Sequence, residues 1–299
     1  MLHAPSPRLR ATLAAIGAPL CWSVGGVVIR SVDAGPWDVV FWRSGSHAIV
    51  LGAALVFLFK GRPIVDFRRA GWIAWISALM LAGVLTFHVL AIMTTTVANV
   101  LIIQSISPIL VALLAPLLLR ERIDFLSATL LAIAFAGLVP VLSGSLAAAG
   151  GEERLAGDLL ALAVVACSTI NVLLIRRWRA FNLVPATVIA GALAAASALP
   201  FTDPFAISAR DMSLLFMLGI VQNVAGVTLF YSALRSLPAA EVTLLALLEP
   251  VLGPIWVWLF IGEEPALTTL IGGAIVLGAL LLKCVADLRR RAPPAAAAS

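Results

Sequence analysis

Hydrophobic residues occur in this chain as long uninterrupted blocks, separated by short segments that carry charge, proline or glycine. The longest block, residues 70–119, holds 50 residues without Asp, Glu, Lys or Arg. Because an α-helix rises about 1.5 Å per residue and a bilayer core is about 30 Å thick, this block corresponds to two membrane crossings. A helix satisfies its own backbone groups within lipid, so the pattern predicts an all-α polytopic membrane protein.

Charged residues, prolines and glycines divide the chain into ten predicted transmembrane helices. Each helix is close to the roughly 20 residues that a bilayer requires. The predicted ranges are 11–30, 37–59, 71–92, 97–118, 123–142, 156–176, 184–200, 211–234, 241–261 and 267–286. The first block is long for a signal peptide and is followed by further spans, so we expect it to be retained.

Composition excludes a water-soluble globule. Apolar residues make up 62% of the chain, charged residues only 12%, and the mean hydropathy is +1.09. The three cysteines, Cys21, Cys167 and Cys284, all lie in apolar stretches, which favours buried thiols over a disulfide framework. No Cys/His spacing typical of zinc occurs, and we expect neither a metal site nor a cofactor.

The positions of the basic residues predict the orientation of the chain. If the N-terminus is cytoplasmic, 16 of the 20 Lys and Arg residues fall on the cytoplasmic side, and only Arg30, Arg43, Arg154 and Arg210 fall outside. The positive-inside rule then places both termini, residues 1–10 and 287–299, in the cytoplasm of a bacterial inner (plasma) membrane. The net charge of +5 is concentrated in these clusters, which indicates contact with membrane lipid and no nucleic-acid partner.

An internal repeat divides the chain into two halves, residues 11–142 and 156–286. At an offset of 142 residues, Pro108 matches Pro250 and Glu121 matches Glu263. Five helices is an odd number, so the second half enters the membrane in the opposite direction. Two inverted five-helix repeats around a central cavity are typical of secondary transporters, whose substrate site lies near the midplane.

Several short motifs carry a resemblance to a known family. They are Leu20-Cys21-Trp22-Ser23, Phe41-Trp42-Arg43, Ser107-Pro108 with Leu119-Arg120-Glu121-Arg122, and Glu249-Pro250 with Ile261-Gly262-Glu263-Glu264. On these residues the chain resembles the EamA branch of the drug/metabolite transporter superfamily. Arg120 and Glu264 stand where that family usually has Gly and Arg. The resemblance implies a ten-helix basket with a central cavity and export of metabolites such as amino acids.

Ionisable residues within the predicted spans are the first candidates for the substrate site, because each costs about 2.5–3.5 kcal/mol on insertion scales. Glu249 lies mid-span, directly before Pro250, which removes a backbone donor and loosens the helix. It is predicted to bind a substrate ammonium or carry a coupling proton; the alternative is a protonated Glu bonded to a neighbouring helix. His88 is either a titrating site residue or a packed, hydrogen-bonded histidine.

The fourth span supplies three further candidates, Asn99, Gln104 and Ser107. Gln104 and Ser107 share a helix face, whereas Asn99 lies about 140° from Gln104 at 3.6 residues per turn. The repeat makes Ser107 equivalent to Glu249, and this pairing indicates the position of the cavity. Polar residues also hold helices together in membranes, which is the structural alternative for Asn99 and Gln104.

Arg43, in the second span, either extends its side chain to the outer surface or clamps a substrate carboxylate. Trp22 is predicted to stack on a flat substrate. Glu121 and Glu263 are expected to be structural, close to the starts of helices. The remaining polar candidates for the substrate site are Asn171, Gln222, Asn223 and Tyr231.

The chain contains no motif for a phosphate loop, a zinc protease or a nucleophile elbow. We therefore predict a secondary transporter and not an enzyme: an exporter of small polar metabolites, such as amino acids, that works by alternating access. Protons are a candidate coupling ion. The alternatives are an intramembrane enzyme that uses Glu249 and His88, or a channel-like facilitator.

Overall fold

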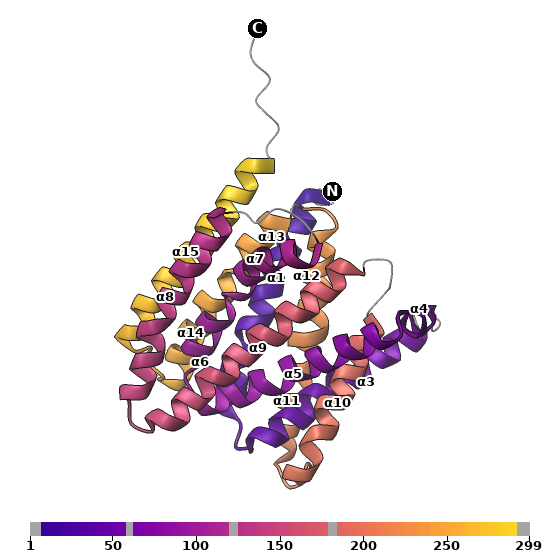
Figure 1. The fold of residues 1–299 in the computed structure, drawn as a ribbon. Coiled ribbons are helices and arrows are strands. Elements are labelled where there is room, and N and C mark those ends of the chain that lie inside the picture. The colour runs from indigo at the N-terminus through magenta and orange to yellow at the C-terminus, as the bar shows by residue number, and fades with distance from the viewer. Residues whose placement is uncertain (1–6, 58–61, 120–124, 179–183, 238, 292–299) are drawn as a thin grey trace, which may run out of the picture.

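A computed structural model of the chain describes residues 7–57, 62–119, 125–178, 184–237 and 239–291. Within these ranges all regular structure is helical (Figure 1). The elements are α1 Pro7–Ser23, α2 Gly25–Ser31, α3 Pro36–Phe57, α4 Arg62–Ala70, α5 Trp72–Thr94, α6 Val97–Gln104, α7 Ser107–Leu119, α8 Phe125–Ala147, α9 Gly151–Arg177, α10 Val184–Ala198, η1 Leu199–Phe201, α11 Ala209–Leu218, η2 Gly219–Gly226, α12 Val227–Leu234, α13 Ala239–Ala246, α14 Leu248–Ile261 and α15 Leu267–Arg291.

Nine segments of the described residues are long and apolar enough to cross a membrane. They are Arg8–Ser31, Pro36–Phe57, Trp72–Thr94, Val97–Ala115, Phe125–Ala147, Gly151–Arg177, Ala209–Leu234, Glu241–Ile261 and Leu267–Arg289. The predicted span 184–200 corresponds to a shorter apolar helix, Pro185–Phe201. The helices therefore occur where the apolar blocks predict them, but this one falls short of the length of the other nine.

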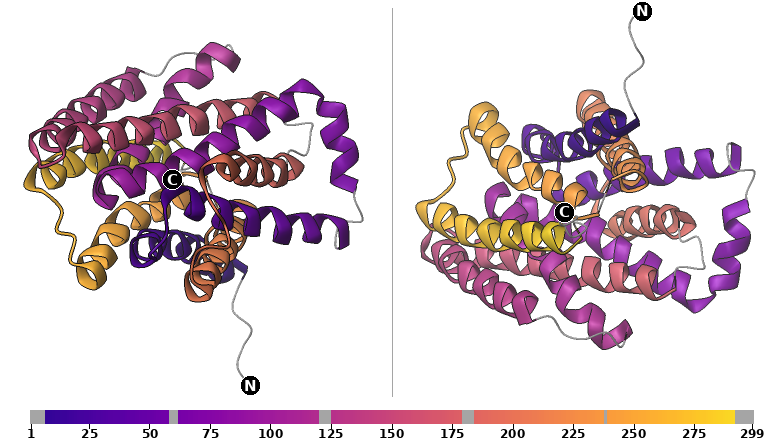
Figure 2. Two further views of the ribbon diagram at one scale, coloured as in Figure 1. Left: turned by 90° about the horizontal axis from the view of Figure 1, so that it is seen from below. Right: turned by 90° about the horizontal axis from the view of Figure 1, so that it is seen from above.

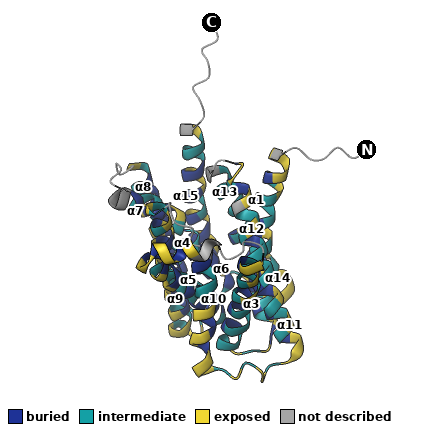
Figure 3. Cartoon of the chain, turned by 90° about the vertical axis from the view of Figure 1, so that its right-hand side faces the viewer, coloured by how far each residue is buried: buried dark blue, intermediate teal, exposed yellow. Residues whose placement is uncertain are grey.

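The surface of the bundle is apolar over its whole length. Exposed residues occur along the helices as well as at their ends (Figure 3), and they include Ile49, Leu79, Val139, Phe260 and Leu282. A water-soluble monomer does not expose contiguous apolar surface of this extent. The chain is an integral membrane protein.

The helices pack as neighbouring pairs that bring distant parts of the sequence together (Figure 2). α5 packs along α9, α8 along α15, α3 along α10, and α1 along α12. The α8–α15 pair is tight because glycines face each other: a Cβ at Gly137 would lie 3.0 Å from the carbonyl oxygen of Gly272. Small residues of this kind allow helix backbones to approach closely in membranes.

Two spans are interrupted at equivalent points of the repeat. The fourth span divides into α6 and α7 around Ser105, and the ninth divides into α13 and α14 at Leu247. Each interruption lies three residues before the proline that the repeat aligns, Pro108 or Pro250. A proline has no N–H for the carbonyl four residues earlier, so it weakens the helix there. Interrupted helices place backbone polar groups inside the bundle, where they need a polar cavity.

One helix, α4, lies between the second and third spans, where long apolar blocks give no indication of it. Phe67 and Ala70 on this helix are buried against Ala74 and Ala186, whereas Arg68 and Arg69 are exposed. Its single apolar face is typical of a helix that lies along a membrane surface instead of crossing it.

Candidate functional site

Arg43 lies inside the helix bundle, with its side chain only 4% exposed. Its Nε donates a hydrogen bond to Gln222 Oε1 at 2.9 Å, and its Nη2 donates to Asn223 Oδ1 at 3.4 Å. The expectation that Arg43 extends to the outer surface is therefore wrong. The reason is that two amides of the eighth span supply acceptors in the interior, which replace part of the water that a guanidinium would otherwise need.

The eighth span is distorted where these two amides lie. Residues Gly219–Gly226 form the π-helix η2, a rare geometry that often marks functional sites. η2 also lies close against α3, because a Cβ at Gly219 would meet Ser46 Oγ and the carbonyl oxygen of Arg43. The wider turn thus presents Gln222 and Asn223 side by side to the guanidinium of Arg43.

Trp22 holds the first span against the same π-helix. Its Nε1 donates to the carbonyl oxygen of Gln222 at 2.9 Å, and Gln222 Nε2 donates back to the carbonyl oxygen of Trp22 at 2.9 Å. The indole also packs against Phe230, with ring centroids 5.3 Å apart. Four of the predicted site residues, Trp22, Arg43, Gln222 and Asn223, thus form one hydrogen-bonded group.

Glu249 faces this group from the opposite half of the chain. Its carboxylate and the guanidinium of Arg43 interact electrostatically, yet no ion pair within 4 Å joins these two described side chains. Glu249 is in the first turn of α14, where the helix dipole favours a negative charge. Its side chain is deep in the bundle and still partly accessible.

His88 and Gln104 complete this set. His88 Nδ1 lies 3.2 Å from Gln104 Oε1 and 3.0 Å from Gln104 Nε2, so the pair can bond in either tautomer of the histidine. The charge of Arg43 also acts on His88. We call Trp22, Arg43, His88, Gln104, Gln222, Asn223 and Glu249 the central cluster.

Some donors of the central cluster have no partner. Arg43 Nη1 and Asn223 Nδ2 are buried and make no hydrogen bond to any described residue. An unpaired buried donor costs about 1–3 kcal/mol, and more when it is charged. In this conformation these two groups are therefore buried donors that remain unsatisfied.

Asn99 lies in a different polar group. Its Nδ2 donates to Ser145 Oγ at 2.7 Å and to Asp158 Oδ1 at 3.2 Å, while its Oδ1 accepts from Thr269 Oγ1 at 2.7 Å. Asp158 also accepts from Thr95 Oγ1 at 2.8 Å. The amide of Asn99 is thus fully occupied by contacts between helices and does not lie with the central cluster.

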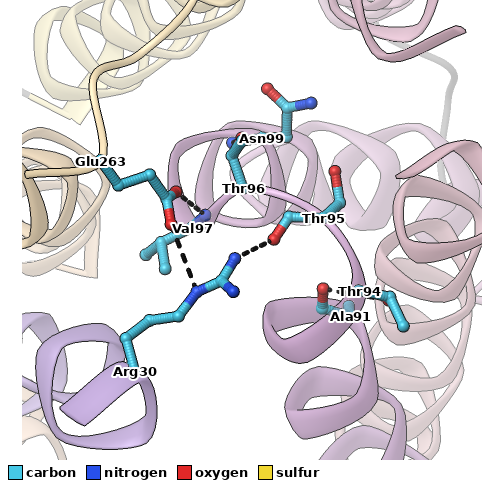
Figure 4. Close-up of polar contacts among 8 residues, drawn as sticks. All are labelled: Arg30, Ala91, Thr94, Thr95, Thr96, Val97, Asn99 and Glu263. Atoms are coloured by element: carbon cyan, nitrogen blue, oxygen red, sulfur yellow. Dashed lines mark hydrogen bonds and ion pairs between the residues drawn. The ribbon is translucent and has the colours of Figure 1, made fainter. Parts of the chain in front are cut away.

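An ion pair extends this second group (Figure 4). Arg30 Nε lies 3.2 Å from Glu263 Oε2, and Arg30 Nη2 donates to the carbonyl oxygen of Thr95 at 2.5 Å. The other oxygen of Glu263 accepts from the backbone N–H of Val97 at 2.9 Å. We call Arg30, Thr95, Val97, Asn99, Ser145, Asp158, Glu263 and Thr269 the distal network, since Thr269 lies in the first turn of α15 and Figure 1 shows that α15 ends near both termini.

The remaining predicted residues are placed elsewhere. Ser107 Oγ bonds to Ser168 Oγ at 3.0 Å, and Asn171 Oδ1 accepts from Ser77 Oγ at 2.6 Å. These contacts join α7 and α5 to α9. The backbone of Tyr231 lies in α12, but its side chain is not among those described, and Glu121 lies outside the described residues altogether.

Comparison with known proteins supplies the family. The model of the EamA-like transporter family matches residues 9–143 and again residues 155–283. The chain belongs to the EamA-like transporter family. A solved structure described only as "Crystal structure of protein" has the same fold, with a TM-score of 0.63 and 21% sequence identity over 94% of this chain and 99% of that one. No curated protein matches at a significant level.

Membership of this family makes the chain a membrane transporter of the drug/metabolite superfamily with a two-repeat architecture. Transporters of this kind act on small molecules and work within a membrane. Among the described residues no group of His, Cys, Asp and Glu is arranged to hold a metal ion.

Two features of this EamA-family protein were not predicted from the sequence: the buried carboxylate of Asp158 and the ion pair between Arg30 and Glu263. Asp158 is fully buried. It lies inside the predicted span 156–176, and an ionisable residue at such a position could have indicated it. Arg30, at the end of the first span, pairs with a glutamate of the second copy of the family signature, Glu263. Only the fold brings these two together, because 233 positions separate them in the sequence.

Proposed function

We propose that this EamA-family protein is a secondary transporter that exports small polar metabolites, with amino acids and related compounds as candidates, by alternating access. The observation that carries the proposal is the interior charge pair of Arg43 and Glu249, one from each half of the chain. Charges inside a membrane protein are costly and mark substrate or ion pathways. Placing them on different halves allows relative motion of the halves to change the site.

The proposal includes ten transmembrane helices, with the short helix Pro185–Phe201 as the seventh, and two inverted repeats at residues 11–142 and 156–286. An even number of crossings agrees with α1 beginning and α15 ending at the same end of the bundle (Figure 1). The distribution of basic residues favours a cytoplasmic location for both termini in a bacterial inner membrane.

Alternating access gives the distal network a role as well. Its hydrogen bonds join residues of the first repeat, including Thr95 and Asn99, to Asp158, Glu263 and Thr269 of the second. This arrangement favours a conformation closed at the end opposite the termini. Opening toward that side requires these bonds to separate, while the central cluster remains between the halves.

Within the central cluster, each charge has a distinct task in this proposal. Glu249 binds the cationic group of the substrate or exchanges a proton, which makes protons a candidate coupling ion. His88 and Gln104 form a hydrogen-bonded pair on which the charge of Arg43 also acts. The interruption of the ninth span directly before Glu249 allows α13 and α14 to change angle during transport.

The test is counterflow in proteoliposomes that contain the purified full-length protein. Vesicles loaded with unlabelled amino acids are diluted into a panel of the same compounds in labelled form. A carrier accumulates label transiently and saturates, whereas a channel-like facilitator does neither. We expect counterflow with part of the panel and a loss of about tenfold to a hundredfold in Glu249→Gln, since a charged hydrogen bond is worth about 1.5–3 kcal/mol. Equal rates in the wild type and Glu249→Gln would remove Glu249 from the site.

A further inference from the structure

Two unpartnered donors of the central cluster belong to two side chains that are hydrogen-bonded to each other. Arg43 Nη2 donates to Asn223 Oδ1 at 3.4 Å, while Arg43 Nη1 and Asn223 Nδ2, the remaining donors of the same two terminal groups, have no partner. A guanidinium only donates hydrogen bonds, so the amide oxygen of Asn223 is the atom that faces it.

The charge of Arg43 is also incompletely balanced. Both of its hydrogen-bond partners, Gln222 and Asn223, are neutral amides, and Glu249 interacts with it from beyond ion-pair distance. A buried cation is stable when it is paired and hydrogen-bonded. A neutral acceptor would satisfy the free N–H groups but would leave this charge uncompensated. An anion satisfies both requirements.

We propose that Arg43 Nη1 and Asn223 Nδ2 together form a subsite for the carboxylate of the substrate. A carboxylate is planar and has two acceptor oxygens, so it can accept from both donors at once, as it does in paired contacts with arginine. The π-helix η2 creates the subsite by turning Asn223 toward α3. The inference rests on the proposed function in one respect, since it takes the bound carboxylate to belong to the transported solute.

The location of the subsite indicates whether the carboxylate comes from a lipid headgroup or from a small solute. The donors belong to α3 and η2 in the interior of the bundle, and Arg43 is only 4% exposed. Lipid headgroups lie at the membrane surface, whereas a small solute can enter the interior. The class of ligand is therefore a small molecule that carries a carboxylate, with Glu249 available for a cationic group on the same molecule.

Acetate and acetamide provide a direct test, because they have the same shape and differ in charge. A ligand with four non-hydrogen atoms binds with a Kd on the order of 1 mM, and binding raises the unfolding temperature of the folded protein. The purified full-length protein in detergent is heated in sodium acetate, or in acetamide with sodium chloride at the same ionic strength. We expect acetate to raise the unfolding temperature above the value in acetamide.

Asn223→Asp is the informative variant. It keeps the size of the side chain and gives Arg43 a carboxylate partner, so we expect it to fold, with an unfolding temperature in chloride no lower than that of the wild type. Its own carboxylate occupies the subsite and repels acetate, which lowers acetate affinity by about tenfold or more. Ser213→Asp is the matched control: it adds the same charge at an exposed position of α11 in the same span and leaves the acetate effect unchanged.

Arg43→Lys gives a second variant should Asn223→Asp fail to fold, because it retains the charge and removes the forked donors. The proposal is overturned if acetate and acetamide have equal effects on the wild type. It is also overturned if the acetate effect persists in the folded variant. Counterflow of labelled L-leucine and L-leucinamide separates this inference from the proposed function: acetate binding without flux of any amino acid rejects transport alone, whereas equal flux of acids and amides rejects the carboxylate subsite alone.

Discussion

The central cluster and the distal network are both buried polar groups between helices, but they differ in how completely their hydrogen bonds are satisfied. In the distal network the amide of Asn99 and the carboxylate of Asp158 bond to neighbouring helices through all of their polar atoms, and Arg30 Nε, which makes no hydrogen bond, is paired with the charge of Glu263 at 3.2 Å. In the central cluster Arg43 and Asn223 each retain a buried donor without a partner. We infer that saturated polar groups hold the fold together, whereas unsatisfied ones can bind a ligand.

The largest expected effect tests the functional side of this comparison. Arg43→Gln should reduce counterflow by on the order of a hundredfold, because it removes the charge that faces Glu249 and the substrate. The same change should lower the unfolding temperature little, since it also removes an incompletely balanced buried charge. Flux and thermal unfolding, measured on one preparation, check both statements. A strongly destabilised Arg43→Gln would mean that the central cluster is structural.

The distal network should show the opposite behaviour. Asp158→Ala leaves Thr95 Oγ1 without its acceptor and Asn99 Nδ2 with Ser145 Oγ as its one remaining acceptor, and each buried donor left unpaired costs about 1–3 kcal/mol. We therefore expect a destabilisation of about 2–5 kcal/mol, seen as a lower unfolding temperature in detergent. Unchanged stability in Asp158→Ala would break the comparison, because it would show that saturation does not contribute to the fold.

A matched pair of asparagines sharpens the contrast at smaller scale. Asn99→Ala removes contacts to Ser145, Asp158 and Thr269, and should cost about 2 kcal/mol of stability. Asn223→Ala removes a single long hydrogen bond to Arg43, and should cost less than about 1 kcal/mol while it weakens acetate binding. Thermal unfolding of both variants side by side gives the difference. Equal losses would contradict it.

The smallest expected effect concerns the ion pair of the distal network. Arg30 and Glu263 are 26% and 22% exposed, so solvent screens their attraction. Glu263→Gln should therefore cost at most about 1 kcal/mol of stability. It should nevertheless favour opening at the distal end, because the charge of Glu263 in the second repeat holds Arg30 of the first repeat. Reaction of Thr95→Cys with a membrane-impermeant maleimide should become faster in this background, and an unchanged rate would exclude this role.

Much of the fold follows from the apolar blocks, because a bilayer demands helices of fixed length wherever it meets apolar chain. The interruptions before Pro108 and Pro250 follow from the chemistry of proline. α4 could not be predicted in this way, because it is short and its apolar residues are interspersed with charged ones, so that it forms no long apolar block. The seventh span, Pro185–Phe201, is short in the structure, in agreement with the predicted range 184–200.

The residues of the central cluster could be predicted from the sequence, but the hydrogen bonds between them could not. Glu249, His88 and Arg43 were identifiable because ionisable residues inside a membrane are energetically costly and usually have a functional role. The contact of Arg43 with Gln222 and Asn223 joins positions 179 and 180 apart, and no spacing in the sequence indicates it. The helix face on which Gln222 and Asn223 lie could not be predicted either, because η2 is a π-helix and does not advance by the roughly 100° per residue of an α-helix.

Asn99 illustrates the converse. The sequence places it in a span beside Gln104, which makes both equally good candidates for a substrate site. Only the fold shows that one amide is occupied by three neighbouring helices and the other by His88. Whether a buried polar group is saturated depends on residues far away in the sequence, and this property separates structural from ligand-binding candidates.

The central claim is that the space beside Arg43 and Glu249 is a wet cavity, reached from one side of the membrane at a time. The direct measurement uses a variant in which Cys21, Cys167 and Cys284 are replaced by serine or alanine and Ala246, at the interruption of the ninth span, is replaced by cysteine. With the distal network closed, a membrane-impermeant maleimide should label this cysteine from the side of the termini and not from the opposite side, and Glu263→Gln should add labelling from that opposite side. Absence of labelling from both sides, in a protein that is folded and inserted, would mean that the interior is dry and would contradict the account.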